Sequence, residues 1–168
     1  MGGFSSPRYS PTTQGNDRMF TDTRKISEDG AWVHVKDGRK KAYRDNEDGT
    51  EDKNRPIRIK VLGPDSKTLQ GRIRARMAKI TKAHGGMNID QMSEDELVEF
   101  MEENSGRLAE NMADATIEWE NMPDGKGGNL PCTVENAVWL YDAYPAILRQ
   151  LRAETSEIDD FLTLAKRS

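Results

Sequence analysis

Residues 55–66 read RPIRIKVLGPDS, and this stretch decides the fold because two kinds of local structure meet in it. Apolar side chains alternate with basic ones from Ile57 to Val61, which is the pattern of a strand with one buried face. Residues 63–66, GPDS, end that strand and supply a helix cap. The sequence therefore predicts a change from sheet to helix after residue 63.

Upstream of this stretch, two short β-like segments flank an Asp-Gly pair. They are AWVHVK at residues 31–36 and RKKAYR at residues 39–44. Asp-Gly between such segments predicts a tight hairpin, because both central residues of a type I′ turn need positive φ. In that register Trp32 lies opposite Tyr43. Val33 then lies opposite Ala42.

Downstream of residue 63, the apolar residues recur at helical spacing. The first helix is predicted to bury Leu69, Ile73, Met77 and Ile80. A second helix opens with a capping box at Ser93 and carries one apolar stripe, formed by Leu97, Met101, Leu108, Met112, Ala115 and Trp119. A third helix begins at Thr133, and Pro145 separates it from a fourth.

These patterns predict an α+β protein with three parts. Residues 1–24 are rich in Gly, Ser, Thr and Pro without periodicity, so we expect a flexible, disordered N-terminal arm. Residues 25–63 are expected to form a small antiparallel sheet of about three strands. Residues 64–168 are expected to supply three to four helices that pack on this sheet, which makes the two parts one domain.

The composition limits the classes of function. The 168 residues are 35% hydrophobic and 32% charged, with a formal net charge of -4, which argues against a coat for nucleic acid or anionic membranes. No apolar run approaches the roughly 18 residues of a membrane span. Cys132 is the single cysteine, so no intramolecular disulfide forms. We expect a cytoplasmic protein without a membrane partner.

Opposite charges are separated along the helical part. Residues 66–83 contain six Lys or Arg residues and no acid, whereas residues 90–103 contain seven Asp or Glu residues and no base. A basic helix can contact nucleic-acid phosphates, but no aromatic residues interleave with its charges to stack on bases. Pairing of the two charged helices with each other, or with a neighbouring copy, is the favoured interpretation.

Residues suited to catalysis or metal binding form no recognisable constellation. Cys132 has only His34 and His84 as histidine bases in the chain, and neither lies in a catalytic motif. One cysteine and two separated histidines also lack zinc-ligand spacing. The acidic loop after the predicted hairpin, DNEDGTEDKN at residues 45–54, suggests a calcium site. Counting back from Gly49, however, places Arg44 where an EF-hand needs its first acidic ligand. We expect no enzyme activity, cofactor or metal, and interpret Cys132 as a packed small residue.

The aromatic residues after Thr133 divide between core and surface. Trp139 and Tyr141 are two residues apart, so on a helix they point about 200° apart. Tyr141 falls on the predicted core stripe, whose other members are Val134, Ala137 and Val138. Trp139 then flanks the core or is exposed, and an exposed Trp is a typical docking anchor.

Four segments occur in an order and spacing that are moderately specific together. They are EDGAWVHV at 28–35, RPIRIKVLGPDS at 55–66, ATIEWENMPDGKGGNLPCTVENAVWLYDAYPAILRQL at 115–151 and DDFL at 159–162. Over residues 29–164 this order resembles a family of small bacteriophage tail-morphogenesis proteins, often described as tail assembly chaperones. The positions that match the later part of the family pattern are Trp119, Gly125, Leu130, Pro131, Cys132, Thr133, Glu135 and Asn136.

The resemblance implies binding without catalysis. Such proteins are thought to associate in the host cytoplasm with the tape measure protein and the tail tube protein, and to protect them until the tube assembles. For this chain we expect Trp139 and Phe161 to act as partner-binding anchors. Charged faces that include Arg72 and Arg76 are expected to steer the encounter.

Two other functions stay open from the sequence. A structural virion protein at the neck, tail or baseplate could clasp neighbouring subunits, or copies of itself, with the arm at residues 1–24. A nucleic-acid-binding protein would use the 66–83 helix through Arg72 and Arg76, although nucleic acid is not the expected partner.

Overall fold

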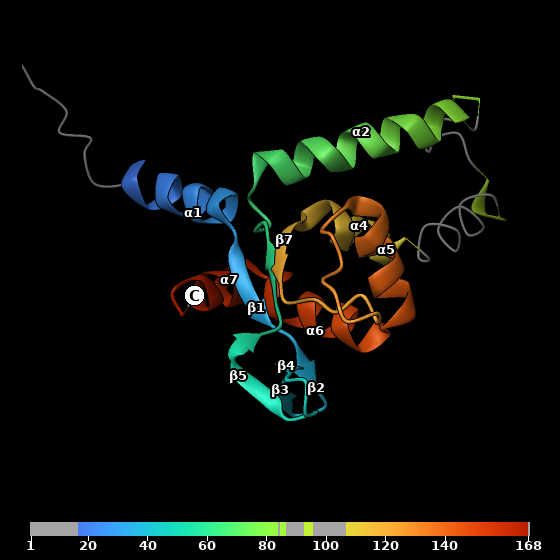
Figure 1. Ribbon diagram of the computed structural model, residues 1–168. Helices are drawn as coiled ribbons and strands as arrows, with labels where there is room; N and C mark the ends of the chain where they lie inside the picture. The colour runs from blue at the N-terminus through green and yellow to red at the C-terminus, as the bar shows by residue number, and fades with distance from the viewer. Residues whose placement is uncertain (1–16, 84, 87–92, 96–106, 168) are drawn as a thin grey trace, which may run out of the picture.

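The computed structural model describes residues 17–83, 85–86, 93–95 and 107–167, and it confirms the α+β class (Figure 1). The helices are α1 (Asp17–Asp29), α2 (Lys67–Ala83), α4 (Leu108–Ala115), α5 (Val134–Ala143), α6 (Pro145–Thr155) and α7 (Ile158–Ala165). The strands are β1 (Ala31–His34), β2 (Lys36–Asp37), β3 (Lys40–Lys41), β4 (Tyr43–Asp45), β5 (Glu51–Pro56), β6 (Arg58–Val61) and β7 (Thr116–Glu120).

A three-stranded antiparallel sheet in the order β1-β6-β7 forms the centre of the molecule. β6 contains the alternating residues of the predicted strand, and its Ile59 and Val61 are fully buried. Ile59 lies opposite Val33 of β1 and opposite Trp119 of β7. Since residues opposite each other on neighbouring strands share a face, these side chains enter the same core.

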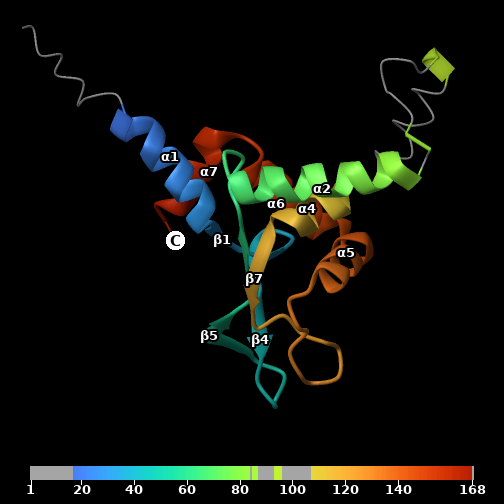
Figure 2. The same ribbon diagram turned by 90° about the horizontal axis from the view of Figure 1, so that it is seen from above.

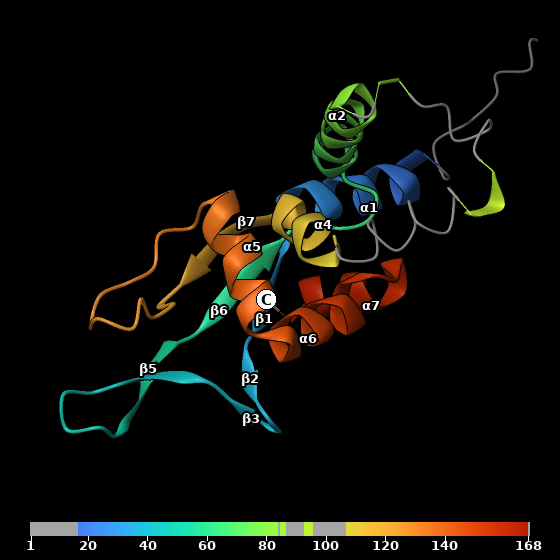
Figure 3. The same ribbon diagram turned by 90° about the vertical axis from the view of Figure 1, so that its right-hand side faces the viewer.

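Helices cover one face of this sheet. Figure 1 looks onto the other face, with α6 and α7 behind the strands, and Figure 3 shows α6 and α7 to one side of them. The core between sheet and helices includes Ala31, Ile57, Met112, Leu140, Leu151 and Phe161. On the opposite face Arg58 and Glu120 form an ion pair at 2.6 Å. A buried face and a charged face are typical of an antiparallel sheet that is covered on one side.

The third strand of the sheet corrects the predicted second helix. The helix ends at Ala115, and residues 116–120, TIEWE, form β7 with Trp119 buried. The spacing of Ala115 and Trp119 fits a helix, but pairing with β6 satisfies the edge of that strand and buries the Trp119 ring beside Ile59. The helical part of the chain therefore contributes a strand, and the predicted boundary at residue 63 does not separate sheet from helices.

The predicted hairpin exists, but its register was wrong. Gly38 has a positive φ of 62° and Arg39 does not, so Gly38 takes the first central position, as in a type II′ turn. Asp37 consequently pairs with Lys40, and Trp32 lies opposite Lys60 of β6 instead of Tyr43. The Ala42 N–H donates a hydrogen bond to the Val35 carbonyl at 2.8 Å, so Ala42 lies opposite Val35 and not opposite Val33. A shift of two residues keeps every side chain on its face, so the alternation pattern cannot detect it.

The predicted arm also needs correction, because residues 17–24 belong to α1, while residues 1–16 lie outside the described residues. Glu28 at the end of this helix caps the start of α2. Its carboxylate accepts hydrogen bonds from the Lys67 N–H at 2.5 Å, the Thr68 N–H at 3.1 Å and the Ser66 hydroxyl at 3.0 Å. The two N–H groups are free donors of a helix N-terminus, so Glu28 of α1 holds the start of α2 in place.

This cap predicts a pH dependence of stability. Hydrogen bonds from the Thr68 side chain and backbone, followed by those from Ser66 and Lys67, hold the pKa of Glu28 below its ordinary value of 4.5. A lowered pKa in the folded state adds stability above the unfolded pKa, and this stability is lost as pH falls through the folded pKa. The melting temperature of Glu28→Gln should therefore lie below that of the wild type at neutral pH, and the difference should vanish in acid. An equal difference at both pH values would contradict the prediction.

α2 begins and ends as predicted and lies on the surface. Ser66 Oγ accepts a hydrogen bond from the Leu69 N–H at 3.0 Å, and the helix ends at Ala83. Figure 2 shows α2 alongside α4, yet none of its residues is fully buried. The predicted contributions of Leu97 and Met101, and most of the acidic segment 90–103, lie outside the described residues. None of the helices in the described ranges combines the length and apolar content needed to cross a bilayer.

Candidate partner-binding groove

α5 places its two aromatic residues on opposite sides, as the sequence predicts. Thr133 caps the helix by accepting a hydrogen bond from the Asn136 N–H at 3.2 Å. Tyr141 is 1% exposed and its hydroxyl is 2.5 Å from the Thr116 hydroxyl on β7, whereas Trp139 is 52% exposed. Burial raises the pKa of Tyr141, so the hydroxyl stays protonated and available for this bond. Tyr141 thus fixes the helix, and Trp139 faces outward.

Val134, which the sequence places on the same core stripe as Tyr141, is not in the core. Val134 is 52% exposed, and Leu140 is buried instead. Val134 lies in the first turn of α5, whereas Leu140 belongs to the hydrophobic core together with Tyr141.

Trp139 forms one wall of an apolar groove of about 270 Å³, called here the Trp139 groove. The ring of Tyr144 stands nearly perpendicular to the Trp139 ring, at 83° and 6.2 Å between centroids, and is itself 52% exposed. The principal lining residues are Val35, Ile57, Met122, Trp139, Tyr144 and Ile147. They come from the end of the sheet, the loop after β7, and the α5–α6 junction. Sequence reasoning missed Tyr144, although its place before the helix-breaking Pro145 was a signal that it sits at a junction.

The floor of the groove is shaped by the loop that follows β7. Asn121 has a positive φ of 55°, and its side-chain amide donates to the Pro56 carbonyl at 2.8 Å. The Leu130 N–H donates to the Met122 carbonyl at 2.8 Å, and the Trp119 indole N–H donates to the Leu130 carbonyl at 2.6 Å. These bonds fix the return of the loop, so that Met122 lies against the groove while the loop tip extends outward.

The glycine-rich tip of this loop is closed by Asp124. Its carboxylate accepts hydrogen bonds from the Lys126 N–H at 2.7 Å and the Gly128 N–H at 2.9 Å. The bond from Lys126, the bond from Gly128 and the nearby Arg44 charge lower the pKa of Asp124. The tip is therefore a turn with a structural carboxylate, and Gly125 supplies one of its positive φ values, 76°.

A second hollow, of about 490 Å³, adjoins the Trp139 groove. The two share Ile57, Pro123 and Gly125 in their walls. The second hollow is bordered by the β4–β5 hairpin and is more polar than the Trp139 groove, with two acids and two bases among its lining residues, namely Asp45, Glu47, Arg44 and Arg55. The continuous surface therefore changes from aromatic at one end to charged at the other.

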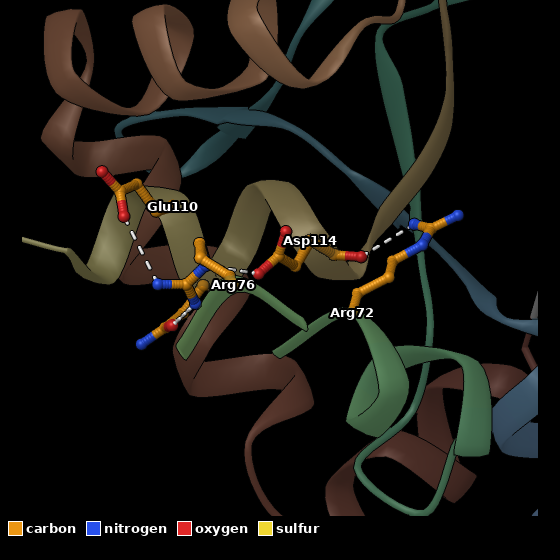
Figure 4. A network of polar contacts seen from close by, with 5 residues as sticks. Arg72, Arg76, Glu110 and Asp114 are labelled. Atoms are coloured by element: carbon orange, nitrogen blue, oxygen red, sulfur yellow. Dashed lines mark hydrogen bonds and ion pairs between the residues drawn. The ribbon is translucent and has the colours of Figure 1, made fainter. Parts of the chain in front are cut away.

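The structure places Arg72 and Arg76, both predicted to bind a partner, in contacts within the chain (Figure 4). Arg76 donates to the Asp114 carboxylate at 2.8 Å, to Glu110 at 3.3 Å and to the Asn111 side chain. Arg72 donates to the backbone carbonyl of Asp114 at 2.8 Å. The sequence favoured pairing of the basic helix with the acidic segment 90–103. The acids that Arg76 contacts are instead Glu110 and Asp114, which lie on α4. These arginines attach α2 to α4, which argues against the steering role expected of them.

Removing the Arg76 side chain should destabilise the protein. The Asp114 side chain is only 12% exposed, so its charge loses a partner in a poorly solvated place. We expect Arg76→Ala to cost about 2 kcal/mol in urea unfolding, because partial exposure weakens the pair below a fully buried one. Arg74→Ala, on the exposed side of the same helix, is the control and should stay within about 0.5 kcal/mol. Equal effects of the two substitutions would contradict this role.

Phe161 is wrong as a partner-binding anchor. It is fully buried in the core, where its ring lies against Gly63 at the start of the segment between β6 and α2. It lies on the inner side of α7, the helix that packs against β1 and α1. An anchor has to be reachable by a partner, so Phe161 serves the fold.

Cys132 is exposed, which corrects its interpretation as a packed residue. It lies between Pro131 and Thr133 in the segment before α5, beside Glu118. Atoms packed around the sulfur raise the pKa of the thiol, and the Glu118 carboxylate raises it further. A thiol with a raised pKa is a poor nucleophile at neutral pH. In the described residues, no group of three or more His, Cys, Asp or Glu side chains is placed to hold a metal ion.

Comparisons with known proteins do not assign the chain to a family. No family model, curated protein or solved structure matches it. The resemblance to tail assembly chaperones therefore stays an expectation from the sequence.

Proposed function

We propose that this protein is a non-enzymatic bacteriophage tail-morphogenesis protein, a tail assembly chaperone that binds the tape measure or tail tube protein through the Trp139 groove. The observation that carries the proposal is an exposed pair of aromatic residues at the rim of an apolar groove; among the described residues, Val134 is the other large hydrophobic side chain with comparable exposure. Large exposed apolar features on a polar protein are typical of interaction sites.

The residues that carry the family resemblance support the proposal, because they build the groove. Trp119 binds the Leu130 carbonyl, and this bond returns the loop that holds Met122. Thr133 caps α5, the helix that presents Trp139. These residues therefore support the surface on which the proposal rests.

The groove suits a chaperone because a half-exposed aromatic pair can bury substantial apolar area of a partner at low cost in side-chain entropy. Trp139 and Tyr144 have few rotatable bonds, and their perpendicular contact already restrains them. A partner segment that enters the groove loses its own exposed apolar surface. Covering that surface lowers the tendency of the partner to aggregate before assembly.

Co-expression with the tape measure protein or the tail tube protein tests the proposal. We expect the wild-type chain to co-purify with one of them and to keep it in solution, and Trp139→Ala to weaken binding about tenfold or more. Val134→Ala is the matched control, because Val134 has the same 52% exposure on the same helix but does not line the groove. Loss of binding in both variants, or no binding by the wild type, would overturn the proposal.

Mass spectrometry of purified particles separates the chaperone from a structural virion protein. A chaperone should be absent from the particles or present in traces. Stoichiometric amounts in the mature particle would instead support the structural function.

A further inference from the structure

The outer edge of the central sheet is closed at one point by a side chain. Gln150 of α6 reaches the place where β1 leads into β2 (Figure 3). Its side-chain nitrogen donates to the His34 carbonyl at 2.9 Å, and its side-chain oxygen accepts a hydrogen bond from the Lys36 N–H at 2.9 Å. These two backbone groups lie on either side of Val35. A residue of a parallel neighbouring strand would bond the same two groups, so Gln150 takes the place of a strand.

Glu154 fixes the orientation of this amide. One oxygen of Glu154 accepts hydrogen bonds from Gln150 Nε2 at 3.0 Å and from Lys36 Nζ at 2.7 Å. A carboxylate only accepts, so the nitrogen of Gln150 has to face Glu154 and the His34 carbonyl, which leaves the oxygen for the Lys36 N–H. Glu154 lies one turn after Gln150 on α6, so one face of the helix supplies both side chains.

The edge that Gln150 occupies is suited to strand pairing. Residues 31–35 read AWVHV, a run of small, β-branched and aromatic residues without Lys, Arg, Asp or Glu. α7 packs against β1, whereas both residues of β2 are exposed. Backbone N–H and C=O groups at such an edge are a template for another strand, and natural proteins cover or block them.

The same edge of a second copy is the strand that fits. In an antiparallel pair with its two-fold axis at Val35, the His34 carbonyl of each copy accepts a hydrogen bond from the Lys36 N–H of the other. These are the two groups that Gln150 holds in the single chain. The side chain of Gln150 and a second copy therefore compete for the same hydrogen bonds.

We propose that the β1–β2 edge is a site of strand addition for a second copy of this chain, and that Gln150 keeps this edge closed. The inference goes beyond the proposed function, because Gln150, Glu154 and Lys36 do not line the Trp139 groove. Removing the Gln150 amide frees both backbone groups, and two copies should then pair edge to edge.

Sedimentation of the full chain tests the proposal. We expect Gln150→Ala to lower the dissociation constant of the dimer about tenfold relative to the wild type, because pairing no longer has to displace the amide. Gln70→Ala is the matched control, since Gln70 is exposed on α2 and its side chain makes no hydrogen bond within the described residues. This variant should associate like the wild type. Equal association of Gln150→Ala and the wild type would overturn the proposal.

Arg76→Ala separates an opened edge from a general loss of stability. This substitution is expected to destabilise the fold, and Arg76 contacts α4 and not the β1–β2 edge. It should therefore leave the dissociation constant of the dimer unchanged. A gain of association equal to that of Gln150→Ala would attribute the dimer to destabilisation and overturn the role of Gln150.

Amide exchange at Lys36 identifies the surface that pairs. In dilute Gln150→Ala the Lys36 N–H should exchange at least about tenfold faster than in the wild type, and it should slow again as the dimer forms. A dimer in which this N–H still exchanges fast would use another surface and contradict the proposal. Slow exchange in the dilute variant would also contradict it, because another group of the same chain would then hold the edge. Each of these results leaves the co-expression test of tail-protein binding unaffected.

Discussion

Gly63→Ala should lower the free energy of unfolding by about 3 kcal/mol. A β-carbon at this position would lie 2.5 Å from the Ser27 hydroxyl oxygen and 2.6 Å from the Phe161 ring. Its distance from the Ser27 α-carbon would be 2.8 Å, so the backbone of α1 would also have to shift. The Gly63 N–H donates to the Ser27 carbonyl at 2.9 Å, and a shift would strain this bond. Urea unfolding measures the loss.

Gly71→Ala is the matched control for this prediction. Gly71 lies within α2, and a β-carbon there would meet no atom within 4 Å. Alanine in a helix interior is more favourable than glycine, so this variant should gain about 0.5–1 kcal/mol. The same substitution, glycine to alanine, is then expected to lower the free energy of unfolding at Gly63 and to raise it at Gly71. A loss of stability at both sites would show that the close approach around Gly63 is not the cause.

Phe161→Ala should cost about 3–5 kcal/mol in unfolding free energy. The ring is fully buried where α7 meets α1 and β1, and its removal leaves a cavity that the surrounding elements fill only in part. Trp139→Ala should cost less than about 1 kcal/mol, because the Trp139 side chain is half exposed. Thermal unfolding of the two variants compares them directly. A larger loss for Trp139→Ala would place Trp139 in the core and contradict its role in the groove.

The elements predicted from short-range patterns agree with the structure. Strand β6, the Ser66 cap of α2, the Thr133 cap of α5 and the break at Pro145 each depend on a few neighbouring residues. Local chemistry determines such features, so the sequence alone suffices to find them.

The errors occur where distant residues decide. Residues 116–120 become a strand because β6 needs a partner, and their spacing alone does not distinguish a strand from a helix. The helix at residues 17–24 has only Met19 and Phe20 as large apolar residues, too few to reveal helical periodicity beside the Gly-, Ser- and Pro-rich residues before it. Glu28 shows its importance only through contact with α2. The hairpin register depends on which residue of the turn adopts positive φ. Turns centred on residues 37–38 and on residues 38–39 place every side chain on the same face of the hairpin, so the alternation pattern does not distinguish them.

The candidate site was only partly visible in the sequence. The 200° separation of neighbouring aromatic residues predicted that Trp139 and Tyr141 face different ways, and their exposures confirm this. The groove itself joins Val35, Ile57 and Met122 to the α5–α6 junction, and no local pattern connects such separated segments. Phe161 was misplaced because the apolar residues of the short helix α7, among them Ile158, Phe161 and Leu162, predict an apolar face but do not indicate whether this chain or a partner covers it.

The pairing of β6 with β7 determines how late in translation the central sheet can form. β6 ends at Val61, yet its partner at residues 116–120 leaves the ribosome only after residues 62–115 have been made. Phe161 follows later still, and Gly63 has no packed neighbour on that side until it arrives. A nascent chain therefore carries Val35 and Ile57 without a completed core for most of its translation, and the Trp139 groove forms only when nearly the whole chain has emerged.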